Sequence, residues 1–179
     1  MHTTWSDGLR STEDMIKAAV QKGYSYVAIT DHSKSLRIGN GLDEKRLLKH
    51  IEEIHTIAKK YPKIHVLTGS EVDILPNGKL DYSDAILKQL DFVVASVHSR
   101  FKSPQQEMTK RILKALDNPY VRVFGHPSGR LINKRNPYQF DFEKVMEKML
   151  KNKIAFEVNS NPSRLDLRDA HIRQVVEAG

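Results

Sequence analysis

Four short runs rich in β-branched and aromatic residues alternate with amphipathic, helix-type segments along this chain of 179 residues. Such alternation predicts βα units, because parallel strands need long crossover connections that helices usually supply. The runs cover residues 26–30, 66–70, 92–97 and 121–125. The sequence therefore predicts an α/β fold with a parallel sheet.

Each of these runs leads into a residue that metal ions bind. Asp31 and His32 follow the first run, Glu71 the second, His98 the third and His126 the fourth. In an α/β barrel the C-terminal ends of the strands face one mouth, so we expect these side chains to form one convergent site. The chain has no cysteine, which leaves imidazole and carboxylate groups as its strong metal ligands.

Helix signals fill the intervals between the runs. Ser11, Asp43 and Asp141 stand at N-cap positions, Gly23 closes the first helix, and Pro62 stops the second. No linker, repeat or change of composition divides the chain, so we expect a single domain over residues 1–179. No membrane-length span or signal peptide is visible, and we expect a cytoplasmic protein. The predicted helices cover residues 11–23, 43–61, 83–90, 104–116 and 141–151.

The formal net charge is +7, which favours a polyanionic partner. Many of the cations fall at or just after the ends of the predicted strands. An exposed, solvated rim would explain the same placement, and only convergence on the site separates the two interpretations. These cations are Arg100, Lys102, Lys110, Arg111, Arg130, Lys134, Arg135 and Arg164.

Five stretches of the chain resemble successive motifs of the polymerase and histidinol phosphatase (PHP) domain, and the resemblance runs almost from end to end. They are MHTTWSDG at residues 1–8, ITDHS at 29–33, GSEVDI at 69–74, ASVHS at 95–99 and GHP at 125–127.

Three stretches are more specific and resemble the PHP domain of bacterial and archaeal family X DNA polymerases. They are DILPNGKLDY at residues 73–82, GHPSGRL at 125–131 and NPSRLDL at 161–167.

The resemblance implies a distorted (β/α)7 barrel that binds up to three divalent metal ions and hydrolyses phosphoesters. In the family X branch it implies a 3′-5′ exonuclease, also able to process abasic sites or blocked 3′ ends, usually with manganese; zinc and iron suit the same ligands. It implies Glu71, His98 and Asp7 as catalytic residues, with Glu71 bridging metal ions. The implied metal ligands are His2, Asp7, His32, Glu71, His98 and His126.

Each of these residues also has a structural interpretation. A histidine at a strand end can be satisfied by hydrogen bonds, and Asp7 or Glu71 could cap a turn or a helix. Recurrence at corresponding positions favours metal binding over that interpretation. Closely spaced metals would activate a water for attack on phosphorus. Arg100, Arg130 and Arg164 are the candidate phosphate-binding residues, since guanidinium groups bind phosphate oxygens in pairs.

His50, His55 and His65 are expected at the surface. The sequence Asp169-Ala170-His171 has the spacing of a metal-binding pair, but its neighbours follow helical periodicity, so a helix is expected there. Glu157 and Asn159 alternate on one face of residues 156–159, so Asn159 could either reach the barrel mouth or have a core or structural hydrogen-bonding role.

The family pattern is incomplete at both ends, since the first motif usually reads His-x-His and a final Asp-x-His strand would follow residue 179. We therefore expect a PHP domain truncated at both ends. The leading hypothesis is a metal-dependent phosphodiesterase acting on DNA 3′ ends, single-stranded or gapped, with a polymerase domain upstream in the parent protein and no membrane partner. The alternatives are a small-molecule phosphatase resembling histidinol phosphatase and a catalytically impaired scaffold that binds DNA.

Overall fold

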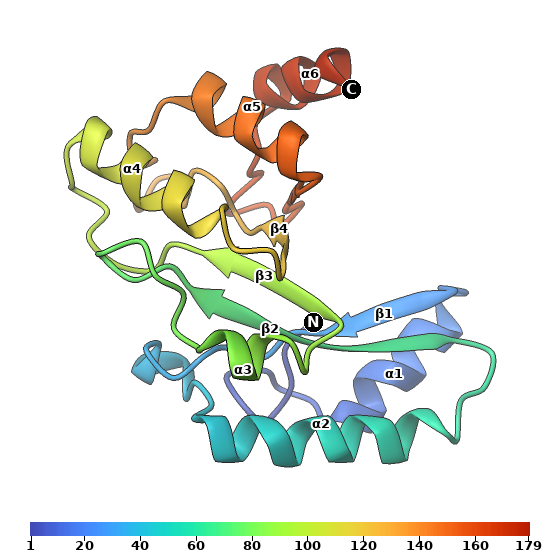
Figure 1. Cartoon of the computed structure of the whole chain (residues 1–179). Coiled ribbons are helices and arrows are strands. Elements are labelled where there is room, and N and C mark those ends of the chain that lie inside the picture. The colour runs from blue at the N-terminus through green and yellow to red at the C-terminus, as the bar shows by residue number, and fades with distance from the viewer. The chain divides into compact units, whose positions relative to one another are not determined.

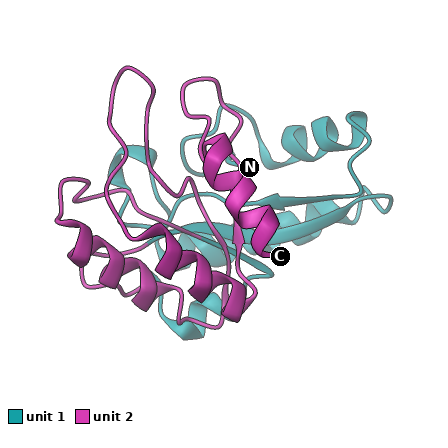
Figure 2. Ribbon diagram, turned by 90° about the horizontal axis from the view of Figure 1, so that it is seen from above, with its two compact units in different colours: residues 1–73, 81–94 teal, residues 74–80, 95–179 magenta.

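The computed structural model describes residues 1–179, which group into two compact units. Unit 1 comprises residues 1–73 and 81–94, and unit 2 comprises residues 74–80 and 95–179 (Figure 2). The chain therefore passes from one unit to the other three times, at residues 73/74, 80/81 and 94/95. The single-domain prediction stays a prediction.

In unit 1, helices and parallel strands alternate as the sequence predicts (Figure 1). The side chains of Ser11 and Asp43 accept hydrogen bonds from the backbone N–H groups of Asp14 and Arg46, which confirms both predicted N-caps. The elements are α1 (Thr12–Gln21), β1 (Tyr26–Ile29), the 3-10 helix η1 (Arg37–Gly39), α2 (Glu44–Ala58), β2 (His65–Asp73), α3 (Asp84–Leu87) and the start of β3 (Phe92–Ser96).

Strands β1 and β2 pair in parallel, with Tyr26 opposite His65 and Ile29 opposite Thr68. Helices α1 and α2 pack on the same face of this pair and on each other (Figure 1). The apolar side chains that recur at helical spacing in α1 and α2 face this contact with the strands. Their burial is why these amphipathic segments fold as helices. The buried cluster consists of Ile16, Ala19, Val27, Ile29, Ile54 and Ile64.

Unit 2 repeats the alternation of helices and strands. Strands β4 and β5 pair in parallel, with Phe124 opposite Phe156. Helix α5 begins where the Asp141 side chain accepts the N–H of Lys144, as the sequence predicts, and packs against α4. The remaining elements are α4 (Gln105–Ala115), β4 (Val121–Phe124), α5 (Phe142–Asn152), β5 (Ala155–Phe156) and α6 (Asp169–Ala178).

The residues 74–80 join unit 2 through hydrogen bonds rather than through a helix or strand. The N–H of Ile74 donates to the carbonyl of Ser96 at 2.8 Å. The buried guanidinium of Arg111, on α4, donates to the carbonyl oxygens of Ile74, Leu75 and Ser99. Arg111 is thus a structural residue rather than part of an exposed basic rim.

The predicted α/β fold is confirmed, with five strands and alternating helices. The predicted helix 83–90 is shorter, because α3 spans only Asp84–Leu87 and ends before Leu90. The helix predicted to run to Tyr61 ends at Ala58, four residues before Pro62. Both differences lie at helix ends, where sequence patterns define boundaries poorly. No helix is long and apolar enough to cross a membrane.

Candidate metal centre

The first residues of the chain lie along β1 and are held by hydrogen bonds to one buried carboxylate, that of Asp31. The N–H of Thr30 donates to the carbonyl of Met1 at 2.8 Å, so the chain enters in extended form beside β1. Asp31, which is 1% exposed, then accepts hydrogen bonds from the backbone N–H and hydroxyl groups of both Thr3 and Ser6. These four bonds turn the chain back, so that His2 and Asp7 lie close together.

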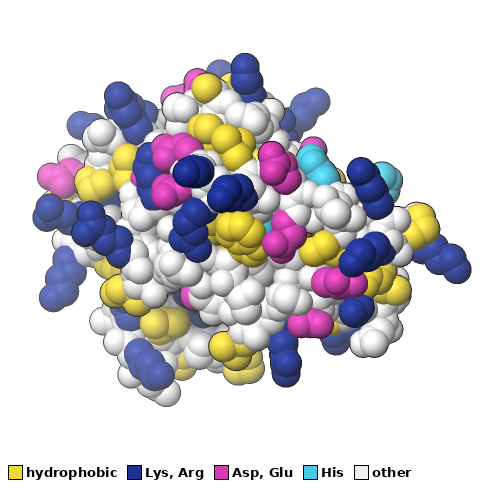
Figure 3. All heavy atoms as spheres, turned by 90° about the horizontal axis from the view of Figure 1, so that it is seen from below, with side chains coloured by type: hydrophobic (Ala, Val, Ile, Leu, Met, Phe, Trp, Pro, Cys, Tyr) yellow, Lys and Arg dark blue, Asp and Glu magenta, His cyan; other side chains and the backbone are white.

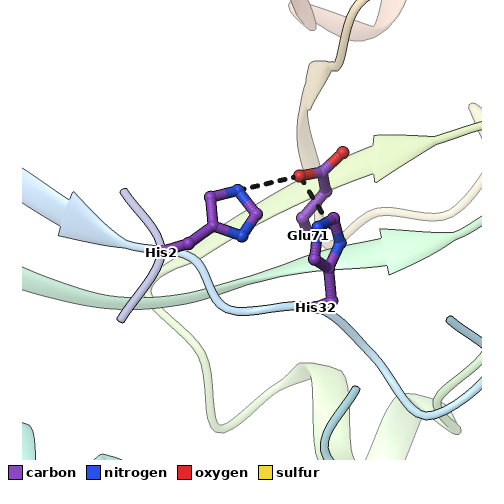
Figure 4. A group of neighbouring side chains, drawn as sticks. All are labelled: His2, His32 and Glu71. Atoms are coloured by element: carbon purple, nitrogen blue, oxygen red, sulfur yellow. Dashed lines mark ion pairs between the residues drawn. The ribbon is translucent and has the colours of Figure 1, made fainter. Parts of the chain in front are cut away.

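His2, His32 and Glu71 form a compact cluster in unit 1 (Figure 4). One atom of Glu71, Oε2, lies 3.1 Å from His2 Nε2 and 3.7 Å from His32 Nδ1. Asp7 approaches the opposite nitrogen of each ring, with Oδ1 3.3 Å from His2 Nδ1 and Oδ2 3.5 Å from His32 Nε2. Two imidazoles are therefore flanked by two carboxylates.

The electrostatics of this cluster favour a cation. Burial favours the neutral form of the His2 imidazole, but the hydrogen bond and negative charge of Glu71, helped by Asp7, raise the pKa of His2 above its ordinary value. Donor atoms of His2, His32 and Glu71 lie within 4.8 Å of one another. Ligands of one ion at about 2.0–2.2 Å stand roughly 3–4.4 Å apart, so this donor set fits a divalent metal after small rotations.

In unit 2, His98 and His126 form a second imidazole group. His98 follows β3 and His126 follows β4, and their Nε2 atoms lie 3.2 Å apart. The backbone of His126 has a positive φ of 26°, and its N–H donates to Glu157. Asn159 in turn donates to Glu157 at 3.3 Å, so these two residues support the His126 turn. Two imidazole nitrogens facing each other suit a shared proton or cation.

The three candidate phosphate-binding arginines differ in their surroundings. Arg100 is exposed, whereas Arg130 is half-buried and donates from Nε to the carbonyl of Arg164 at 2.7 Å and from Nη2 to the carbonyl of Leu165. Arg164 is also half-buried, and its Nη1 has no hydrogen-bond partner. Their role in phosphate binding stays a prediction.

Lysine and arginine side chains are interspersed with aspartate and glutamate on the face that Figure 3 draws. The net charge of +7 is therefore not gathered into one basic patch on that face. Several cations form ion pairs with neighbouring carboxylates, as Lys34 does with Glu44 and Lys148 with Asp117.

His50 corrects a prediction, because it is fully buried rather than at the surface. Its ring stacks on Trp5 with 4.8 Å between centroids, and its Nδ1 lies 3.6 Å from Asp31 Oδ2. The signal was present in the sequence, since Leu47, His50, Ile51 and Ile54 follow the i, i+3, i+4, i+7 spacing of a buried helix face. His55 and His65 are exposed, as predicted.

His50 is expected to make stability depend on pH. Burial lowers the pKa of His50, so the unfolded chain binds this proton at a higher pH than the folded protein does. Stability from this group is therefore complete above the ordinary histidine pKa of about 6.5 and falls as the pH drops towards the lower folded value. Thermal unfolding followed by Trp5 fluorescence at pH ~7.5 and ~5.5 measures the loss.

The matched variants are His50→Gln and His55→Gln, which lie on the same helix with a buried and an exposed side chain. The melting temperature of His50→Gln should fall less than that of the wild type between the two pH values, while His55→Gln should behave as the wild type. If the melting temperature of His50→Gln depended on pH as strongly as that of the wild type, His50 would not be the source of the pH dependence.

Asp169, Ala170 and His171 begin helix α6, which confirms the helix predicted for this segment. The His171 ring stacks on Phe142 at 4.0 Å between centroids.

The fold and its side-chain clusters define a parallel α/β protein with imidazole and carboxylate groups at the ends of its strands. The profile of the PHP domain family matches residues 1–161, which is most of the chain. The chain therefore belongs to the PHP domain family, as the sequence motifs predict.

Among curated relatives, the chain is similar to the DNA polymerase/3′-5′ exonuclease PolX of Bacillus subtilis, with 44% identity over 179 residues. The match covers all of this chain and 31% of the relative, so the chain spans about a third of that protein's length.

Two solved structures share the fold. A Listeria monocytogenes protein assigned as the histidinol phosphatase hisK aligns with a TM-score of 0.76 and 15% identity, over 98% of this chain and 89% of that one. The histidinol phosphate phosphatase of Lactococcus lactis, solved with zinc, L-histidinol and phosphate, aligns with a TM-score of 0.64 and 18% identity, over 100% and 80%.

Proposed function

We propose that this chain is a metal-dependent phosphodiesterase that hydrolyses DNA at its 3′ ends. The observation that carries the proposal is the cluster of His2, His32, Glu71 and Asp7, in which two carboxylates flank two imidazoles with N–O distances of 3.1, 3.3, 3.5 and 3.7 Å. Membership of the PHP family and the similarity to a relative named as a polymerase and 3′-5′ exonuclease support it.

The residues proposed to hold divalent metal ions are the six strand-end and N-terminal side chains. Bound metals would supply a water acidic enough to ionise near neutral pH and would neutralise charge on the phosphate. Glu71, with one oxygen near both His2 and His32, suits a bridging ligand. Manganese, zinc and iron all accept such ligands, and up to three ions are proposed. The ligands are His2, Asp7, His32, Glu71, His98 and His126.

The proposed substrate-binding groups are cationic, because the phosphodiester backbone is the common feature of every DNA end. Arg100 is exposed, Arg130 donates to two backbone carbonyl oxygens, and Arg164 has an unpartnered Nη1. We propose that they grip backbone phosphates, and that a polymerase domain elsewhere in the parent protein delivers the DNA end.

Two alternatives make different predictions. A small-molecule phosphatase is favoured by the fold shared with a protein solved with L-histidinol and phosphate. A catalytically impaired scaffold would bind DNA through its cations without hydrolysing it. The substrate preference of the metal-loaded protein distinguishes all three functions.

The test measures hydrolysis of different substrates, with different added metals, by one preparation of the protein. The chain is stripped with EDTA, its metal content is measured by elemental mass spectrometry, and Mn²⁺ or Zn²⁺ is added back. We expect nucleotide release from a 3′-labelled single strand only with metal, and at least about tenfold less turnover of histidinol phosphate and p-nitrophenyl phosphate. Faster turnover of histidinol phosphate would favour the phosphatase. DNA binding that survives EDTA, falls with salt and leads to no hydrolysis would favour the scaffold.

A further inference from the structure

A cavity of about 320 Å³ lies within unit 2, between the loop that follows His126 and the first turns of α5 and α6. Its lining combines aromatic rings with cationic side chains. Phe140, Phe142 and His171 supply the rings, and Arg130 and Arg168 supply the charges. None of the predicted metal ligands lines this cavity.

The aromatic rings at the cavity contact one another in a stack. His171 lies on Phe142 with the ring planes 12° from parallel, and Phe156 stacks on Phe142 with its centroid 5.5 Å away. Phe140 lies beside the stack, 6.2 Å from Phe142. Phe140 and His171 are only partly buried. They therefore offer ring surface to the cavity, and planar ring surfaces of this kind bind nucleobases by stacking.

The charges at the cavity are not neutralised by carboxylates. Two carbonyl oxygens fix one edge of the Arg130 guanidinium, which leaves its other edge as a pair of donors. Arg168 precedes α6, where its backbone carbonyl accepts the N–H groups of His171 and Ile172, and its side chain is exposed. The buried Asp166 carboxylate accepts the backbone N–H groups of Ser128 and Gly129 instead of pairing with either arginine.

The charges of the two arginines also act on the His171 ring. Burial lowers the pKa of His171, and the charges of Arg168 and Arg130 lower it further against the opposing charge of Asp166. His171 is thus neutral near pH 7, which suits a stacking role, while the two arginines attract an anion.

We propose that this cavity binds one nucleotide unit, with the base stacked on the Phe140 and His171 rings and the phosphate held by Arg130 and Arg168. The inference rests on the proposed function for the class of substrate, because a DNA strand is a series of such units. The cavity matches the lower end of the usual size of small-ligand sites, about 300–1,000 Å³.

The test is a binding measurement that does not depend on hydrolysis. Calorimetric titration of the chain in EDTA with 5′-dAMP, 2-deoxyribose 5-phosphate and inorganic phosphate separates the base from the phosphate. We expect dAMP to bind at least about tenfold more tightly than the sugar phosphate, because only dAMP can stack. His171→Leu and Arg168→Gln should each weaken dAMP binding by about tenfold.

Arg173→Gln is the matched control. Arg173 is an exposed arginine on α6, the helix that carries His171, and it does not line the cavity. It should bind dAMP as the wild type does, and circular dichroism should show all variants folded. Equal affinity for dAMP and the sugar phosphate, absence of binding, or unchanged affinity in both cavity variants would overturn the proposal.

Failure of this inference and failure of the proposed function give different results. Metal-dependent DNA hydrolysis without cavity-dependent dAMP binding would overturn the nucleotide site alone. Cavity-dependent dAMP binding with no hydrolysis of any DNA end would retain the site and overturn the proposed function.

Discussion

Replacement of Glu71 by glutamine should abolish hydrolysis, with a loss of roughly 100-fold or more, and should lower the bound metal measured by elemental mass spectrometry. Glu71 Oε2 lies near both His2 Nε2 and His32 Nδ1, so the variant loses the negative charge that both imidazoles face. The side chain is 9% exposed, and glutamine has nearly its size, so the fold should survive.

Glu52→Gln provides the matched control, because the Glu52 side chain is exposed on α2 and has no role in the cluster. This variant should hydrolyse substrate and bind metal as the wild type does. Full hydrolysis and full metal content in a folded Glu71→Gln protein would exclude Glu71 as a ligand and with it the proposed metal centre.

Asp31→Ala should lower the free energy of unfolding by about 3–5 kcal/mol. The carboxylate of Asp31 is buried and accepts four hydrogen bonds from Thr3 and Ser6. Alanine leaves those backbone and hydroxyl donors without their acceptor and releases the turn that holds His2 beside Glu71. Urea unfolding followed by the fluorescence of Trp5 measures this loss directly, since the indole packs on His50 next to the carboxylate.

The comparison is with Asp117→Asn, which removes an exposed carboxylate paired with Lys148. Its effect should stay within about 1 kcal/mol, because exposed ion pairs contribute little. If Asp31→Ala proved no more destabilising than Asp117→Asn, the turn of residues 3–7 would have to be held by something other than this carboxylate.

The order of the main elements could be predicted from local patterns alone. Ser11, Asp43 and Asp141 each cap a helix as their position before an amphipathic segment predicts. The alternation of strands and helices was sufficient for the α/β fold. The lengths of α3 and β5 were not predictable, because such short elements depend on tertiary contacts more than on their own residues.

The candidate site was predicted less completely. The carboxyl ends of parallel strands lie at one edge of a sheet, so the topology predicts that His32 and Glu71, which follow the first two predicted strands, lie close together. The burial of His50 contradicts the surface position that a polar imidazole predicts, although its position on the helix matches the apolar face. The contacts of Arg130 with the carbonyl oxygens of Arg164 and Leu165 join segments more than thirty residues apart, and no local pattern encodes them.

The three crossings of the chain between its units constrain how the molecule can be assembled during synthesis. Residues 74–80 leave the ribosome well before residues 95–179, to whose unit they belong. Arg111, whose guanidinium anchors Ile74 and Leu75, emerges some thirty-five residues after them. The nascent chain must therefore carry this segment without its Arg111 contacts while residues 81–94 of unit 1 are synthesised. No single cut of the chain separates the units, so each must be studied within the whole chain.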